Sequence, residues 1–209
     1  MPVFAIALII PFFEKFLHMK DITRDIILNI SPMSEASLEA IIGLVDFIEY
    51  PRGEIFVEKS KRNSYEYFVL EGVCRSFLLN PEGEEITISF FSENTIISPF
   101  TTRTSNGFSN LNFQALTPLK IGAMDASRFE ELMVENLEIR EFGNSVLRNE
   151  LNQKVEKEIG MASMTAKERL LKFREHFPLL ENLVPHTTIS TYLGITNISL
   201  SRLRNELVK

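Results

Sequence analysis

With 209 residues, of which 44% are hydrophobic, the chain is long enough for one large domain or two modest ones with an apolar core. The 22 Lys and Arg against 28 Asp and Glu give a formal net charge of −6, which excludes a molecule that binds nucleic acid over its whole surface. The one cysteine, Cys74, excludes an intramolecular disulfide framework and a cysteine-ligated zinc or iron–sulfur site within one chain, and it fits the reducing cytoplasm.

Residues 2–13 are apolar and lack a basic segment at their start. At about a dozen residues the stretch is too short to span a bilayer, which takes about 20. A secretory signal is an alternative, but no small-residue cleavage site follows before Lys15. We interpret the stretch as a helix packed on the body or as an extension before the natural start. We therefore expect a protein that is neither secreted nor bound to a membrane.

Two blocks follow that differ in periodicity. Residues 14–45 carry Ser34 and Ser37 as candidate caps and apolar residues at helical spacing, which predicts short helices. Residues 46–124 contain short runs of β-branched and aromatic residues between turn residues, the pattern of a β-roll or barrel. Residues 98–110 are expected to form a long polar loop within this block.

A long helix is predicted over residues 137–161, and a further helix over 166–176. The apolar side chains of the long helix recur mostly every four residues on one side, and they are Phe142, Val146, Leu147, Leu151, Val155 and Ile159. A helix of this length with one apolar stripe needs a partner surface. That surface is either the same helix of a second copy, which makes a homodimer, or the chain's own β-domain.

The C-terminal segment differs from the rest in charge. Residues 164–209 contain seven Lys or Arg and four Glu, a net charge of +3, so residues 1–163 carry −9. An acidic body with a weakly basic end fits a carrier with a DNA-binding terminus. A chance fluctuation of charge is the alternative.

Residues 186–207 have the spacing of a helix-turn-helix. Ser190 supplies the small side chain where two helices cross, Gly194 tolerates the positive φ of the turn, and Thr196 is the N-cap of the second helix. The apolar positions that must face inward from both helices are all filled, by Ile189, Leu193, Ile195, Leu200 and Leu203. The alternative is an ordinary helical hairpin at the end of a domain.

Polar side chains of this motif are the candidates for contact with DNA. Those of the second helix are expected to reach base edges in the major groove, and Arg202 can pair bidentately with a guanine. Thr187 and Thr188, at the start of the first helix, are expected to hydrogen-bond phosphates beside its N-terminal amides. The predicted DNA-binding residues are Thr187, Thr188, Thr196, Asn197, Ser199, Arg202 and Asn205.

These features resemble the Crp/Fnr family of bacterial regulators over nearly everything from about residue 16 to residue 209. The resemblance rests on YFVLEGV at 67–73, NPEGEE at 80–85, the long central helix, and YLGIT and LSRLR within 192–204. It implies an α+β fold with an N-terminal cyclic-nucleotide-binding-like β-roll, a central dimerisation helix and a C-terminal helix-turn-helix domain of winged-helix-like type.

The same resemblance implies homodimers that bind two-fold-related half-sites of double-stranded DNA, a palindromic operator, with RNA polymerase as a further candidate partner. Arg202 falls where the family carries a base-contacting arginine. Asn197 and Ile198 fall where better-known members carry an arginine and a glutamate, so the target sequence of those members does not transfer to this chain.

No effector follows from the resemblance. Members that bind cyclic nucleotides carry a Gly-Glu pair followed by an Arg-Ser or Arg-Thr pair; residues 97–111 contain neither, and Arg103 stands at a different offset. The N-terminal cysteine cluster of the oxygen-sensing branch is missing too. Residues 46–124 contain no histidine to ligate haem or the metal of a cupin-like enzyme. We therefore predict no cofactor, no metal, no enzymatic activity and no response to cAMP.

The expected organisation is a helical and β-roll sensor-like domain over residues 1–136, a dimerisation helix over 137–163 and a DNA-binding domain over 164–209. The expected function is sequence-specific, DNA-binding regulation of transcription in the cytoplasm. The alternative is a small-molecule-sensing β-roll protein whose helix-turn-helix serves protein interaction.

Overall fold

The structure, a computed structural model, describes residues 3–102 and 106–207, with side chains from residue 14 onward except that of residue 100. Two helices open the chain, α1 (Val3–Ile30) and α2 (Glu35–Ile42). Ser34 caps α2 by accepting a hydrogen bond from the Ser37 backbone N–H, as predicted. The expectation of short helices is wrong for α1, which runs without a break to Ile30. The interpretation of residues 2–13 lies outside the side chains that the structure describes.

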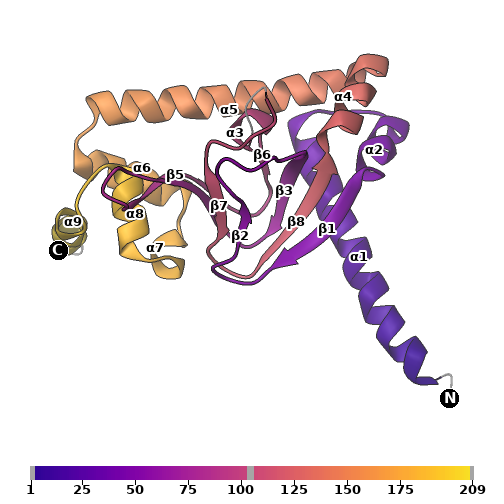
Figure 1. Ribbon diagram of the computed structural model, residues 1–209, viewed down its shortest axis with the longest axis horizontal. Helices are drawn as coiled ribbons and strands as arrows, with labels where there is room; N and C mark the ends of the chain where they lie inside the picture. Colours follow the sequence, from indigo (N-terminus) through magenta and orange to yellow (C-terminus); the bar gives the residue numbers. More distant parts are fainter. Residues whose placement is uncertain (1–2, 103–105, 208–209) are drawn as a thin grey trace.

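The block over residues 46–124 folds into two antiparallel sheets, as its periodicity predicts (Figure 1). The sheets have the strand orders β1-β8-β3-β6 and β2-β7-β4-β5. The strands are β1 (Val45–Tyr50), β2 (Ile55–Val57), β3 (Tyr65–Glu71), β4 (Cys74–Leu79), β5 (Glu85–Phe91), β6 (Thr95–Ile97), β7 (Asn112–Ala115) and β8 (Leu119–Asp125).

Two connections of the roll carry specific constraints. Gly72 joins β3 to β4 with a φ of +87°, and a Cβ on it would lie 2.2 Å from the carbonyl oxygen of Pro118, so no side chain fits there. Residues 98–110, predicted as a loop, include the one-turn helix α3 (Pro99–Thr102). Arg103 lies outside the described residues.

Aromatic rings fill the interior of the roll. The ring centroid of Phe56 lies 5.7 Å from that of Tyr67 and 6.1 Å from that of Phe113. Phe91 lies 6.0 Å from Phe113 in the same way. Cys74 is fully buried in this core, and burial raises the pKa of its thiol, which makes it a structural rather than a reactive cysteine.

Two helices follow the roll. The short α4 (Ala126–Glu135) leads into α5 (Leu137–Ser163), which Asn136 caps through the backbone N–H groups of Glu138 and Ile139. The helix predicted over 137–161 is thereby confirmed. In Figure 1, α5 extends from the end of the roll near α2 to the C-terminal helices at the other end of the molecule.

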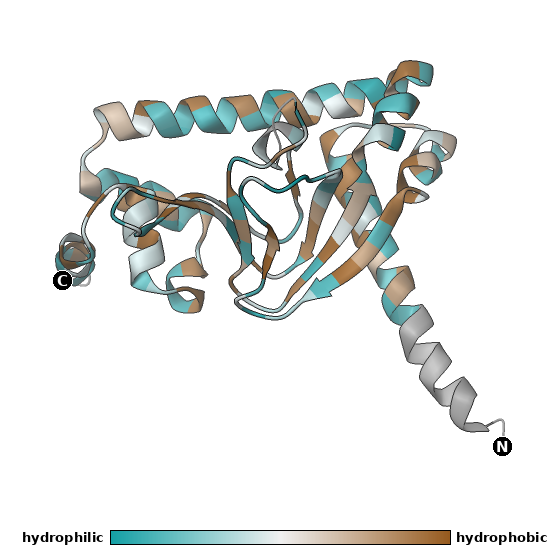
Figure 2. Ribbon diagram, viewed as in Figure 1, coloured by the Kyte–Doolittle hydropathy of each residue, from teal (hydrophilic) through white to brown (hydrophobic). Residues whose placement is uncertain are grey.

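The apolar side chains of α5 do not form one stripe with one partner. Phe142 and Val146 are buried in a core shared with α1 and α2. Leu151, Val155 and Ile159 are 62%, 45% and 56% exposed. Figure 2 shows hydrophobic positions recurring among hydrophilic ones along α5. The predicted stripe therefore divides into a half that packs on its own chain and a half that has no cover within it.

The C-terminal segment is helical: α6 (Ala166–His176), α7 (Leu180–Leu183), α8 (His186–Leu193) and α9 (Asn197–Leu207). A capping box between Thr165 and Glu168 fixes the start of α6. Residues 164–207 contain no strand, so the described part of this segment lacks the wing of a winged helix. Within the described residues, no helix has the length and apolar character that crossing a membrane requires.

Candidate nucleic-acid interface

The helix pair α8 and α9 has the boundaries that the sequence predicts. Ile189 and Leu193 of α8 expose 2% or less, and Leu200 and Leu203 of α9 expose 9% or less. Ser190 is 3% exposed, and its hydroxyl donates to the carbonyl of Thr187 at 2.9 Å, so a small side chain does occupy the inner side of α8. The two helices are thus held together by one apolar contact surface.

Gly194 forms the turn between them in the left-handed conformation, with φ +65° and ψ +38°. Its backbone N–H reaches the carbonyls of Ser190 and Thr191 and so ends α8. A Cβ on Gly194 would lie 2.6 Å from the Cε of Met161 in α5. The left-handed backbone conformation therefore favours glycine here, whereas the Met161 methyl group is the end of a flexible side chain and can move.

Thr196 caps α9, as predicted. Its hydroxyl oxygen accepts a hydrogen bond from the Ser199 backbone N–H at 3.1 Å. The Ser199 hydroxyl lies 3.0 Å from the same oxygen and is half-buried. Of the predicted base-contacting residues, Ser199 thus turns toward the cap rather than straight outward.

The outer face of α9 is exposed along its whole length. We call this set of side chains the α9 outer face: Asn197, Ile198, Ser201, Arg202 and Asn205. Ile198 is 84% exposed and the Arg202 side chain 74%, and within the described residues Arg202 forms only one ion pair, a long one of 3.9 Å to Glu206. The sequence predicts Asn197, Arg202 and Asn205 on this face. Ile198 is named only through the family resemblance and not as a DNA contact, and Ser201 is missed. Helical spacing was the signal that could have found them, because Ile198 lies four residues before Arg202 and Ser201 lies four residues after Asn197.

Thr187 and Thr188 at the start of α8 have different surroundings. Thr187 is exposed, as a phosphate contact requires. Thr188 is only 7% exposed, and its carbonyl accepts a hydrogen bond from the Thr191 hydroxyl at 3.1 Å. The expectation for Thr188 is corrected accordingly, because α8 turns this side chain toward the protein and away from solvent.

Two other arginines of the C-terminal helices, Arg174 and Arg204, bind side chains of the same helices. Arg204 lies 3.2 Å from Glu181 and 2.6 Å from the imidazole Nε2 of His186. Arg174 donates to the same Glu181 at 2.5 Å. Arg202 therefore differs from Arg204 in being free to reach an outside partner.

Helix α8 is docked on strand β5, which is the edge strand of its sheet. The backbone N–H of Thr87 donates to the Thr191 hydroxyl at 3.2 Å. The ring centroid of Phe90 in β5 lies 5.0 Å from that of Tyr192, and burial raises the pKa of the Tyr192 phenol. The edge of the roll is thus covered by the first helix of the pair.

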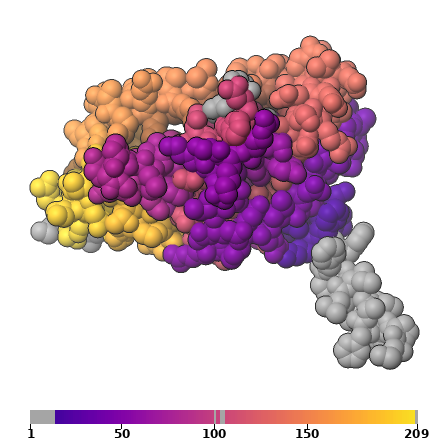
Figure 3. Space-filling model, viewed as in Figure 1, coloured from indigo at the N-terminus to yellow at the C-terminus, as the bar shows by residue number. Residues whose placement is uncertain are grey.

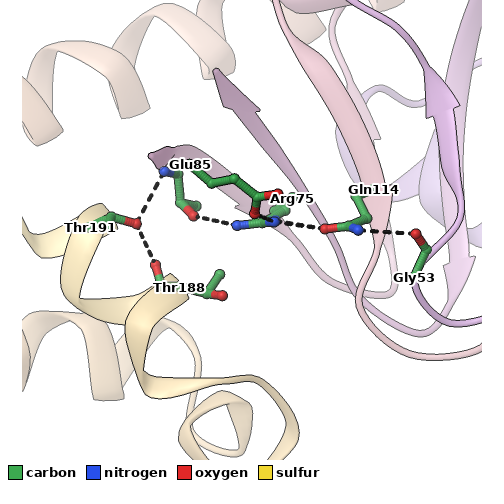
Figure 4. A network of polar contacts seen from close by, with 7 residues as sticks. Gly53, Arg75, Glu85, Gln114, Thr188 and Thr191 are labelled. Atoms are coloured by element: carbon green, nitrogen blue, oxygen red, sulfur yellow. Dashed lines mark hydrogen bonds and ion pairs between the residues drawn. The ribbon is translucent and has the colours of Figure 1, made fainter. Parts of the chain in front are cut away.

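Figure 4 shows a polar network that extends from this contact into the roll. The buried Arg75 guanidinium donates to the Thr87 hydroxyl at 3.3 Å and to the amide oxygen of Gln114 at 2.7 Å, and it forms an ion pair with Glu85. Gln114 in turn donates to the carbonyl of Gly53 at 3.0 Å. Hydrogen bonds therefore connect α8 with the β1–β2 turn through one buried arginine.

Nowhere in residues 14–102 or 106–207 do three His, Cys, Asp or Glu side chains gather as metal ligands would.

Comparison with known proteins identifies relatives of the fold. Residues 47–136 match the family model described as the cyclic nucleotide-binding domain. No curated protein matches the chain.

Several solved structures share the architecture at low identity. FixK2 from Bradyrhizobium japonicum is 19% identical with a TM-score of 0.67, over 78% of this chain and 84% of that one. A transcriptional regulator of the Crp/Fnr family from Eubacterium rectale is 16% identical with a TM-score of 0.66, over 86% and 88%. The regulator CLP of Xanthomonas campestris, described as responsive to c-di-GMP, is 12% identical with a TM-score of 0.64, over 83% and 91%. The chain therefore has an α+β fold in which a cyclic nucleotide-binding domain precedes C-terminal helices, the architecture of Crp/Fnr-type regulators.

Proposed function

We propose that this chain is a sequence-specific DNA-binding regulator of transcription, with α9 as the helix that enters the major groove. The α9 outer face carries the proposal. A helix held from behind by α8, and capped at a tight turn, presents five adjacent exposed side chains, four of which donate or accept hydrogen bonds.

Individual roles follow from the chemistry of base edges. Arg202 is proposed to pair with the O6 and N7 of a guanine, and Asn197 and Asn205 to bond neighbouring bases. Ile198 offers an apolar contact suited to the C5 methyl group of thymine. Thr187 and the first amides of α8 are proposed to hold a phosphate, and Thr196 and Ser199 remain candidates at the start of α9.

The uncovered half of α5 supports a homodimer. Leu151, Val155 and Ile159 recur at a spacing of four residues on a helix of 27 residues, as in a helix–helix seam. Two chains paired there would place two copies of α9 on half-sites about 34 Å apart, which favours a palindromic operator. In this proposal residues 1–136 form the sensor-like part, 137–163 the pairing helix and 164–209 the DNA-binding part, and the regulator acts in the cytoplasm.

The roll is proposed not to respond to cAMP. A cyclic nucleotide needs a cation for its phosphate and space for its base within the roll. Tyr67, Phe91 and Phe113 occupy the interior, and Arg75 is committed to Glu85 and Gln114 on its outer side. The described residues of the roll thus fit a solid core better than a nucleotide site, and we propose no enzymatic role.

One observation favours a second candidate. Ile198, at 84% exposure, is an unusual side chain for a helix that meets only water, and it would also suit contact with another protein. In that case the helix pair would be a protein-interaction module, as an alternative to DNA binding.

Fluorescence anisotropy on labelled duplex DNA separates the two. A regulator is expected to bind duplex at low salt, with an affinity that falls steeply and log-linearly as salt rises, because phosphate contacts release counterions. The variant Arg202→Ala should bind more weakly, while Arg128→Ala, on α4 and far along the chain from α9, should not. Absence of binding at low salt would leave the protein-interaction module in its place.

A further inference from the structure

A cavity opens outside the roll, where its β5 edge meets the helices. It has a volume of about 440 Å³ and lies between β5 and β6 on one side, the second half of α5 on another, and α6 and α8 on the third. Figure 3 shows the opening between α5, in orange, and the strands beneath it. A volume of this size accommodates a small organic molecule. We call this space the junction cavity.

One wall of the junction cavity is aromatic. Phe90 of β5 stands at its centre, with ring centroids 5.0 Å from Tyr192, 5.8 Å from Phe173 and 5.9 Å from Phe177. These rings come from the roll, α6 and α8, so the wall exists only while the helices are docked on β5. Such a wall offers a large apolar area to the body of a ligand.

The charged part of the lining is mostly cationic, in a chain that is acidic overall. Lys154, Lys157, Arg169 and Lys172 line the cavity together with two acids, Glu150 and Glu156. Both acids are already used, because Lys154 lies 2.8 Å from Glu150 and Lys172 lies 3.5 Å from Glu156. Two cationic groups of the lining are therefore left over.

The leftover cations are bound only to neutral groups. Lys157 donates to the carbonyl of Ile88, and its ammonium lies 4.0 Å from the centroid of the Tyr192 ring. Arg169 donates to the carbonyls of Leu193 and Met164 at 3.0 and 2.7 Å. Among the described residues, no carboxylate is found within 4.0 Å of either cation.

The position of Lys157 has a cost that an anion would remove. Ile88 is the extra residue of a bulge in β5, since Ser89 pairs with Ser76 and Thr87 with Phe77. Its carbonyl attracts the ammonium out of solvent, and desolvation lowers the pKa of Lys157 to about 8. A partly desolvated cation without a counter-charge is unfavourable, and a bound anion would compensate it.

We propose that the junction cavity binds a small organic anion with an aromatic or aliphatic body, its acidic group at Lys157 and Arg169 and its body against Phe90 and Tyr192. The site lies outside the roll interior, which is filled by its own side chains. Because its walls come from both the roll and the C-terminal helices, an occupant stabilises the docked arrangement of α8. This adds ligand control to the proposed DNA binding, on which that regulatory consequence rests; the binding itself is tested without DNA.

The test uses two probes with the same aromatic skeleton, 1-anilinonaphthalene-8-sulfonate, an anion, and N-phenyl-1-naphthylamine, which is neutral. Both fluoresce on entering an apolar site, and each is titrated into the full chain. We expect saturable binding of the sulfonate, tighter than that of the amine. The substitution Lys157→Gln should weaken the sulfonate about tenfold or more and leave the amine unchanged, because one charge-assisted contact is lost.

The control is Lys167→Gln, which makes the same charge change at an exposed position of α6 outside the cavity lining. It should leave both affinities unchanged. Unchanged binding of the amine to Lys157→Gln also shows that the cavity is still formed in that variant. If Lys157→Gln does not bind the amine normally, Lys157→Met is measured in the same way. Equal sulfonate affinity of the native chain and a folded Lys157 variant overturns the proposal, as does equal weakening by Lys167→Gln. Duplex binding that persists alongside such a result would leave the proposed function intact.

Discussion

At the scale of single residues, the α9 outer face combines two kinds of recognition. Arg202 and the asparagines can bond polar base edges, whereas Ile198 is apolar and 84% exposed. An apolar side chain in the major groove discriminates through the methyl group of thymine, which uracil lacks. Polarity and helical position predict the polar members from the sequence. They do not mark Ile198 as a DNA contact, because an isolated apolar residue in a helix is equally expected to face the core.

Replacing single thymines by deoxyuridine in a bound duplex tests the role of Ile198. The native chain should lose about fourfold in affinity at one thymine per half-site, since a buried methyl group contributes about 0.8 kcal/mol. In Ile198→Ser this sensitivity should disappear. Competition anisotropy with matched thymine and deoxyuridine duplexes measures both. A serine variant that kept the full sensitivity at every thymine would show that another residue reads the methyl group.

Lys157 makes a second prediction at this scale, on pH. Its pKa in the folded chain is lowered from 10.5 to about 8 by desolvation. Below about pH 8, Lys157 is protonated in both the folded and the unfolded chain, and the folded chain carries the free-energy cost of burying the charge. Between about pH 8 and 10.5 only the unfolded state holds it, so stability contributed by this group rises with pH.

Urea unfolding of the native chain and of Lys157→Met at pH 7 and pH 10 measures this. The free energy of unfolding of the native chain should increase relative to that of the variant over this interval, because other titrating groups are shared and cancel. A difference between the two proteins that is the same at both pH values would contradict the perturbed lysine.

At the scale of elements, the helix pair was predictable and its docking was not. Ser190, Gly194, Thr196 and the inward apolar residues identify α8 and α9 with the boundaries found, because each of these positions has a local requirement. The contact between Thr87 and Thr191 joins residues 104 positions apart. Hydrophobic periodicity within one segment cannot predict a contact between residues so far apart in sequence. The burial of Thr188 results from the docking of α8 on β5 rather than from the helix-turn-helix motif.

The docking contact can be weakened by one substitution. Thr191→Val removes the acceptor of the buried Thr87 N–H while keeping the shape of the side chain, and should lower the free energy of unfolding by about 1–3 kcal/mol. Thr187→Val is the control, since Thr187 is exposed, and should change stability by less than about 0.5 kcal/mol. Unfolding of both variants by denaturant measures these free energies. Equal effects of the two substitutions would mean that the hydrogen bond to β5 is not a stabilising contact.

At the scale of the whole molecule, α5 presents three different surfaces. Its first half packs on the helices beside the roll, its second half leaves an apolar stripe uncovered, and its inner side lines the junction cavity. The sequence predicted the helix and its apolar residues. It could not divide them between the chain itself and a second copy, because which side meets the roll depends on how the roll is placed.

The homodimer is tested by Leu151→Asp. A carboxylate in the seam would be buried without a partner, so we expect a mass in light scattering equal to one chain of 24.0 kDa, against twice that for the native protein. Leu179→Asp makes the same change at a leucine that is 69% exposed, close to the 62% of Leu151, but lies outside α5. It should leave the dimer intact. An unchanged mass for Leu151→Asp would place the pairing surface elsewhere.

The central claim is that α9 reads base sequence through Arg202, and selection of bound duplexes from a random pool tests it most directly. The native chain should enrich an inverted repeat with half-sites about one helical turn apart. Arg202→Ala should lose about 1–3 kcal/mol of discrimination at one guanine in each half-site and keep the other preferences. A pool without enrichment, or a variant with the same preference as the native chain at every position, would contradict the account.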